Sequence, residues 1–211
     1  MKIPKEILTE QADEVQQMFR YWMDFMEHRV EFWTIPGDLD IHTQGHCERV
    51  LLHALRLGNQ RGVKLRPMIA LAHASIFHDT RRKDNYLDTG HGDRAAEYYK
   101  EFCEKQKLHL LPEAFAAIKF HDRDDKLGEE YIEKEAKDEA PLWLEVYRDF
   151  KDADALDRLR LGTWCLDERF LRTDEARQMP AFAQQLVEAT IPADELRRTY
   201  ALTEPFRNRR L

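Results

Sequence analysis

A histidine and an aspartate stand side by side at the end of the most apolar segment of the chain. His78 and Asp79 follow the stretch MIALAHASIF (68–77), which is apolar nearly all round and therefore predicts a central, buried helix. A carboxylate at the end of such a helix is costly unless a positive charge compensates it. Arg81 or Arg82 could supply that charge, and so could a divalent cation.

A second histidine and a second aspartate are predicted to point inward from other helices. In GHCERVLLHAL, Val50 falls on the same helical face as His46, which directs the imidazole toward the core. In FKDADALDRLRLG, Asp154 shares one side of a helix with Tyr147 and Phe150. Two imidazoles and two carboxylates suit a hard or borderline divalent ion and leave coordination positions for water and substrate.

The order of these residues resembles a known family. His46-x-x-Arg49-Val50, then His78-Asp79 after an apolar helix, then the run DADALD from Asp152 to Asp157, is similar to the HD superfamily of metal-dependent phosphohydrolases. The resemblance covers roughly residues 40–162. It implies an all-helical bundle that binds a divalent metal, and it implies that the metal ligands are His46, His78, Asp79 and Asp154.

A second His-Asp pair, His121-Asp122, follows AFAAIKF, but no partner motif precedes it at the family distance. We therefore take His78-Asp79 as the metal pair. In several branches of the family, two further histidines between this pair and the last aspartate complete a second metal site or bind phosphate. His91 and His121 stand in that order here. His91 lies in a glycine-flanked loop before a helix, where free helix N–H groups could also receive an anion.

Arg82 follows Asp79 by three residues, a position at which some branches of the family have a lysine that contacts phosphate. The alarmone hydrolases have a glutamate there, so the segment Thr80 to Lys83 disfavours alarmone hydrolysis. A guanidinium matches phosphate oxygens in a bidentate manner, which predicts a phosphate clamp. The alternative interpretation of Arg82 is a solvated basic loop.

The remaining histidines are given structural interpretations. His53 lies two helical turns from His46 and is placed around the site, whereas His73 is assigned to the core. Three others are interpreted as surface or loop residues, namely His28, His42 and His109. His42 and His46 are four residues apart, but Gly45 disfavours a helix that would pair them.

Apolar residues recur at three- and four-residue steps along the chain, which predicts an all-α protein. The helices are expected at 6–32, 45–57, 67–79, 93–106, 112–121 and 141–161, with further helices broken at Pro180 and Pro192. On the helix 141–161, Asp152 and Arg160 are expected to face water. The charged stretch 122–140 is interpreted as a solvated loop or a surface helix, or alternatively as a lid over a site.

We predict one compact domain, a single-domain helical bundle of the HD-domain type. Residues 1–36 form an amphipathic helix packed on the core, 37–162 form the metal-binding core, and 163–211 form a C-terminal helical segment with a basic tail.

Composition excludes several classes of protein. The 211 residues carry a net charge of −7, which argues against a non-specific nucleic-acid binder. The three cysteines form no CxxC pair, so neither a cysteine zinc site nor a disulfide framework is expected. We see no signal peptide and no apolar stretch long enough to span a membrane, so a cytoplasmic location is expected.

The sequence therefore predicts a phosphohydrolase that uses one or two divalent ions (Mn, Fe, Co, Ni, Zn or Mg) and acts on a nucleotide or another small phosphorylated metabolite. Asp79 would hold the metal and orient a water, and Arg82 would neutralise charge on phosphate. Two alternatives stay open. One is a mixed-valent di-iron oxygenase of HD type, and the other is a non-catalytic helical module that binds metal or nucleotide. The long N-terminal helix offers a surface for a homodimer.

Overall fold

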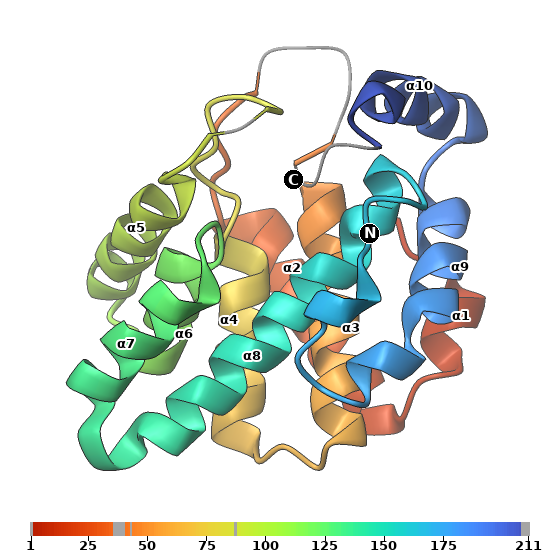
Figure 1. Cartoon of the computed structure of the whole chain (residues 1–211). Coiled ribbons are helices and arrows are strands. Elements are labelled where there is room, and N and C mark those ends of the chain that lie inside the picture. Colours follow the sequence, from red (N-terminus) through yellow and green to blue (C-terminus); the bar gives the residue numbers. More distant parts are fainter. Residues whose placement is uncertain (1, 36–40, 43, 87, 208–211) are drawn as a thin grey trace.

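The computed structural model describes residues 2–35, 41–42, 44–86 and 88–207, and among these it contains helices and no strand. The helices pack into one bundle (Figure 1), so the expected all-α fold is confirmed. The α-helices are α1 (Lys5–Thr9), α2 (Asp13–Arg29), α3 (Gln44–Gln60), α4 (Leu65–Phe77), α5 (His91–Gln106), α6 (Pro112–Phe120), α7 (Asp125–Ala136), α8 (Ala140–Leu156), α9 (Pro180–Thr190) and α10 (Ala193–Thr203). In the part of the chain that the structure describes, no helix has the length and apolar character needed to cross a membrane.

Helix α4 lies at the centre of the bundle, as its all-round apolar sequence predicts. It packs against α3, α6 and α8, and its side chains at Leu71 and Ile76 have no exposed surface. His78 closes the helix, where its backbone N–H donates to the carbonyl of Ala74. The buried helix thus delivers the His-Asp pair to one end of the bundle.

The N-terminal helix differs from its prediction, because 6–32 is not one helix. Helix α1 ends at Thr9, Ala12 is extended, and α2 starts at Asp13. The cause is Gln11, whose buried side chain donates to the carbonyl of Ile7 (2.9 Å) and accepts from the Arg56 guanidinium (2.7 Å). This hydrogen bond to Arg56 of α3 fixes Gln11 in a non-helical position, so α1 ends and the chain changes direction before α2.

The expectation that Asp152 and Arg160 face water is wrong. Asp152 has no exposed surface, and it accepts hydrogen bonds from the backbone N–H groups of Arg172 and Thr173, both at 2.8 Å. Arg160 is 4% exposed and donates to the carbonyl of Ile41 at 2.9 Å. Both residues lie on faces that are covered by segments distant in sequence.

The charged stretch 122–140 contains a helix packed on the bundle, in agreement with the surface-helix interpretation. Asp124 caps α7 by accepting from the N–H of Lys126 (2.9 Å), and the helix buries Ile132 against the core. Its contacts are with α6 and α8. Nothing in this packing favours the lid interpretation.

Acid is expected to destabilise the protein through the buried imidazole of His53. The side chain has no exposed surface, and neither ring nitrogen finds a hydrogen-bond partner among the described residues. Burial lowers the pKa of His53 from 6.5 to about 4. Because the folded-state pKa lies below the unfolded value, the stability contribution is complete above pH 6.5 and is lost as the pH falls toward 4.

Between pH 7 and pH 5 this group should remove about 2 kcal/mol of unfolding free energy. His53→Leu should therefore lose less stability over that interval than the parent protein when urea unfolding is measured at both pH values. His28→Gln is the control, because His28 is exposed on α2. Equal pH slopes in the parent and His53→Leu would contradict the prediction.

Candidate metal centre

Five helices bring histidines and aspartates together at one end of the bundle. The amino ends of α3 and α5 and the carboxyl ends of α4 and α6 lie at this end, and α8 passes beside them (Figure 1). The six predicted metal- and phosphate-binding residues all converge here, namely His46, His78, Asp79, His91, His121 and Asp154. Asp154 is 28% exposed at its side chain, so the cluster reaches solvent.

One group of ligand atoms surrounds Nε2 of His46. This atom lies 3.1 Å from Nε2 of His78, 3.2 Å from Oδ1 of Asp154 and 3.5 Å from Oδ2 of Asp79. His78 Nε2 lies 3.8 Å from both of these carboxylate oxygens. We call these four residues the first position.

A second group surrounds the other oxygen of Asp79. Oδ1 of Asp79 lies 3.0 Å from Nε2 of His91 and 3.5 Å from Nε2 of His121, and the two histidine nitrogens are 2.7 Å apart. We call His91, His121 and this oxygen the second position. Asp79 therefore offers one oxygen to each position.

Hydrogen bonds on the far side of each ring determine which nitrogen carries the proton. In all four histidines Nδ1 faces an oxygen that accepts: Asp157 Oδ2 for His46 (2.7 Å), Ser75 O for His78 (2.9 Å), Asp88 O for His91 (2.7 Å) and Ile118 O for His121 (2.7 Å). Nδ1 must therefore donate, and the Nε2 lone pairs are left pointing at one another. Such lone pairs repel unless a proton or a cation lies between them.

The spacing of the ligand atoms fits a metal ion. Metal–ligand bonds of about 2.0–2.2 Å place neighbouring ligand atoms roughly 3.0–3.5 Å apart. The distances within the two positions run from 2.7 to 3.8 Å. Three overlapping groups could hold an ion, namely His42 with His46 and Asp79, His46 with His78 and Asp154, and His78 with Asp79 and His121. Imidazole nitrogens with carboxylate oxygens suit first-row divalent metals.

Electrostatics keeps the carboxylates ionised and one imidazole neutral. Burial alone would raise the pKa of Asp79, but the surrounding imidazoles, foremost His78, hold it well below its usual range. The pKa of Asp154 is likewise held low, against burial, by His46 and its neighbours. Burial lowers the pKa of His78 to about 3, and Asp79 raises that of His121 against burial. Two negatively charged carboxylates thus lie beside imidazole nitrogens that can bind a metal ion.

His46 is supported by a buried carboxylate that the sequence analysis did not assign. Asp157 accepts from Nδ1 of His46 and also from the Arg49 guanidinium, through Nε (2.7 Å) and Nη2 (3.1 Å). Arg49 and Arg160 hold the pKa of Asp157 below its usual range despite burial. A carboxylate behind a ligating imidazole fixes its orientation and raises its basicity.

Arg82 lies beside the second position rather than in a solvated loop. It is 6% exposed, and its Nη1 lies 3.1 Å from Nε2 of His91 and 3.8 Å from Oδ1 of Asp79. Its remaining N–H groups donate to the carbonyls of Asp84 and Tyr86. The basic-loop interpretation is therefore wrong, although the structure does not test the phosphate clamp.

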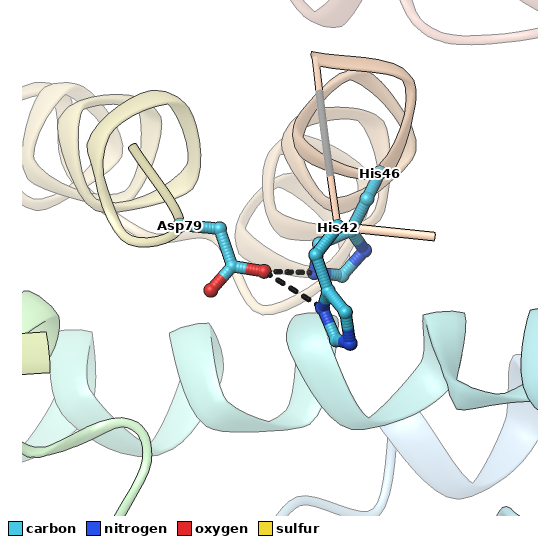
Figure 2. A group of neighbouring side chains, drawn as sticks. All are labelled: His42, His46 and Asp79. Carbon is cyan, nitrogen blue, oxygen red and sulfur yellow. Dashed lines mark hydrogen bonds and ion pairs between the residues drawn. The ribbon is translucent and has the colours of Figure 1, made fainter. Parts of the chain in front are cut away.

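The site also contains a histidine that the sequence analysis placed on the surface. His42 precedes α3, and its Nδ1 lies 3.0 Å from Oδ2 of Asp79, close to His46 (Figure 2). Arg160 approaches the same nitrogen at 3.1 Å. The four-residue spacing of His42 and His46 is the sequence signal for their proximity, and the low helix propensity of Gly45 argues against it. Gly45 is in fact helical, within α3.

His28, His73 and His109 agree with their interpretations, whereas His53 is buried but makes no hydrogen bond to a ligand among the described residues. In the second His-Asp pair, His121 belongs to the metal cluster and Asp122 has a different role. His53 and His73 are buried, and His73 bonds the Tyr99 hydroxyl (2.8 Å). Asp122 does not join the metal cluster directly. It accepts from the N–H of Gly90 (2.6 Å) and so supports the loop that carries His91.

Gly92→Ala is expected to separate His91 from His121. A Cβ at residue 92 would lie 2.7 Å from the carbonyl oxygen of Lys119 and 2.8 Å from that of Ile118, and backbone cannot yield as a side chain can. We expect a loss of about 1–3 kcal/mol in unfolding free energy and weaker metal binding at the second position. Urea unfolding and metal titration measure the two effects.

Gly45→Ala is the matched control, since Gly45 adjoins His46. There a Cβ would lie 3.2 Å from the flexible end of the Lys2 side chain and 3.8 Å, an ordinary contact distance, from Nη1 of Arg49. A Gly92→Ala protein as stable as Gly45→Ala, with unchanged metal binding, would show that the close packing of α5 on α6 does not position His91.

A scan against protein-family models finds no match for this chain, and comparisons with curated proteins and with solved structures find no significant match. The site therefore stands on the geometry of this chain: a buried cluster of histidine and aspartate side chains that could hold a metal ion.

Proposed function

We propose that the protein is a divalent-metal-dependent phosphohydrolase that acts on a phosphate ester or anhydride in a nucleotide or another small metabolite. The observation that carries the proposal is the carboxylate of Asp79, which faces two pairs of imidazoles with one oxygen each. The resemblance of His46, His78-Asp79 and Asp154 to the ordered residues of the HD superfamily supports the same reaction class.

The residues present fit a divalent ion, and their roles follow from their positions. His46, His78, Asp79 and Asp154 would hold one ion, and His91, His121 and Asp79 could hold another. A bound ion would supply a water of lowered pKa and would polarise a phosphoryl oxygen. Asp79 would help to orient that water, and Asp154 lies at the solvent-reaching edge of the cluster.

Positive side chains beside the cluster favour a phosphate substrate. Arg82 lies against the second position, and Arg160 lies against His42. Fixed guanidinium groups stabilise the charge that develops on phosphoryl oxygens during hydrolysis. This feature favours a substrate that carries a phosphate group.

Phosphate release tests the proposal. Metal-free protein would be loaded with Mn²⁺ and assayed with nucleoside mono-, di- and triphosphates, dinucleoside polyphosphates and sugar phosphates. We expect release that depends on the metal and is lost in His78→Ala with the helical circular dichroism intact. His109→Ala, which changes an exposed histidine between α5 and α6, should keep the activity.

Three results would contradict the proposal. One is phosphate release that survives in His78→Ala. Another is the absence of release from the whole panel while the protein binds about two irons per chain and consumes oxygen, which would favour the oxygenase. The third is tight nucleotide binding without turnover, which would favour the non-catalytic module.

A further inference from the structure

We propose that Arg82 makes the two metal positions unequal: the first position binds a divalent ion strongly, whereas the Arg82 guanidinium opposes an ion at the second position until an anion such as phosphate binds to that guanidinium. This inference rests on the metal centre of the proposed function and concerns how that centre is filled.

The guanidinium is a permanent cation placed against two ligands of the second position. Its Nη1 lies 3.1 Å from Nε2 and 3.3 Å from Nδ1 of His91, and 3.8 Å from Oδ1 of Asp79. An arginine side chain offers only donors and does not lose its proton in proteins. It therefore places a permanent positive charge beside the second position, where it repels a second cation.

Local contacts hold the guanidinium there without neutralising it. Nη2 donates to the carbonyl of Tyr86 at 2.6 Å, and Nε donates to that of Asp84 at 3.3 Å. Both acceptors are neutral. The carboxylate that Arg82 pairs with is Asp79, so the negative charge available to an ion at the second position is already partly compensated.

The first position has more protein ligands. It gathers four against three, and Nδ1 of His46 donates to Asp157, a carboxylate that also pairs with Arg49 and Arg160. In the second position, the rings of His91 and His121 donate to carbonyls, and Asp122 lies further from His91 Nδ1, at 3.4 Å.

Arg160 lies near the first position, but it meets that position differently. It contacts Nδ1 of His42 at 3.1 Å and pairs with Asp157 at 3.5 Å. The charge of Arg160 is thus paired with Asp157, whereas the charge of Arg82 is paired with the shared ligand Asp79.

The arrangement couples metal loading to anion binding. Phosphate oxygens can bind the guanidinium in a bidentate manner and add negative charge beside the second position. By linkage, phosphate must raise the affinity for the second ion by the same factor by which that ion raises the affinity for phosphate. A substrate phosphate would therefore favour metal binding at the second position, beside which it reacts.

Titration of metal-free protein with Mn²⁺, with free Mn²⁺ followed by electron paramagnetic resonance, tests the inference. We expect two classes of site whose dissociation constants for Mn²⁺ differ by about tenfold or more. Arg82→Gln should tighten the weaker class about tenfold and leave the tighter class unchanged. Inorganic phosphate should tighten the weaker class in the parent protein and have little effect in Arg82→Gln.

Two further variants separate charge from loop support. Lys83→Gln removes the same charge from the next residue, which is exposed, and should change neither class. Arg82→Lys keeps the positive charge but loses the guanidinium that donates to the carbonyls of Asp84 and Tyr86. The Mn²⁺ affinity of the weaker class should therefore stay low in this variant. Equal affinities in the parent protein, or a weaker class that Arg82→Gln leaves unchanged or weakens, would overturn the inference.

The outcomes distinguish this inference from the proposed function. Unequal sites that respond to Arg82→Gln in a protein that releases no phosphate would support the inference and refute the phosphohydrolase. Two metal sites of equal affinity in a protein that does release phosphate would refute the inference and support the phosphohydrolase.

Discussion

Asp79→Asn is expected to abolish metal binding at both positions and, with it, phosphate release. Each oxygen of Asp79 faces a different pair of imidazoles, so the loss of its charge affects both groups of ligands. Removing a partner that only supports a ligand lowers metal affinity by about 10–100-fold, and the loss of this shared carboxylate should exceed that. Elemental analysis and Mn²⁺ titration measure the effect.

The amide is nearly the same size as the carboxylate, so the fold should survive the change. Circular dichroism should show unchanged helix content in Asp79→Asn. The control is Asp24→Asn, which changes a carboxylate exposed on α2 and should bind metal like the parent protein. An Asp79→Asn protein that retains one ion per chain at parental affinity would refute the central role of this residue.

Asp157→Ala is expected to lower the unfolding free energy by about 3–5 kcal/mol. Asp157 has no exposed surface, and its removal leaves the buried Arg49 guanidinium and Nδ1 of His46 without their acceptor. An uncompensated buried charge is the cause of the large effect. Asp157→Asn keeps an acceptor for His46 but not the charge, and it should weaken metal binding at the first position by about 10–100-fold.

Urea unfolding at pH 7 measures the stability change. The comparison is Asp174→Ala, because Asp174 also pairs with an arginine, Arg177 (2.5 Å), but is 89% exposed. That exposed pair should contribute no more than about 1 kcal/mol. Similar losses in Asp157→Ala and Asp174→Ala would show that the buried pair does not support the site.

The helices and the inward positions of His46, His78, Asp79 and Asp154 could be predicted because their signals are local, whereas His91 and His121 were assigned through the family resemblance. A three- and four-residue period marks each helix, and the apolar segment before His78 indicates a buried end. The positions of His46 and Asp154 follow from the helical faces that they share with core residues. The resemblance then supplied the order in which these residues meet.

The parts that could not be predicted depend on contacts between distant segments. The break after Thr9 comes from a bond between Gln11 and Arg56, and the burial of Asp152 comes from the backbone at Arg172. Arg49 and Asp157 were both visible in the motif, but they meet across 108 residues of sequence. Sequence patterns within one helix carry no information about such partners.

His42 shows how a local rule can mislead. A glycine next to His46 lowers helix propensity, but packing of α3 against α2, α4 and α8 outweighs a penalty of about 1 kcal/mol. With Gly45 inside α3, His42 stands just before the start of the helix at Gln44, and its Nδ1 lies 3.0 Å from Oδ2 of Asp79.

The metal content of the purified protein tests the central claim most directly. Elemental analysis after loading with Mn²⁺, Fe²⁺, Co²⁺, Ni²⁺ or Zn²⁺ and removal of free metal should find at least one ion per chain, and that ion should be lost in Asp79→Asn. A chain that retains none of these metals, while its helices remain folded, would contradict the account.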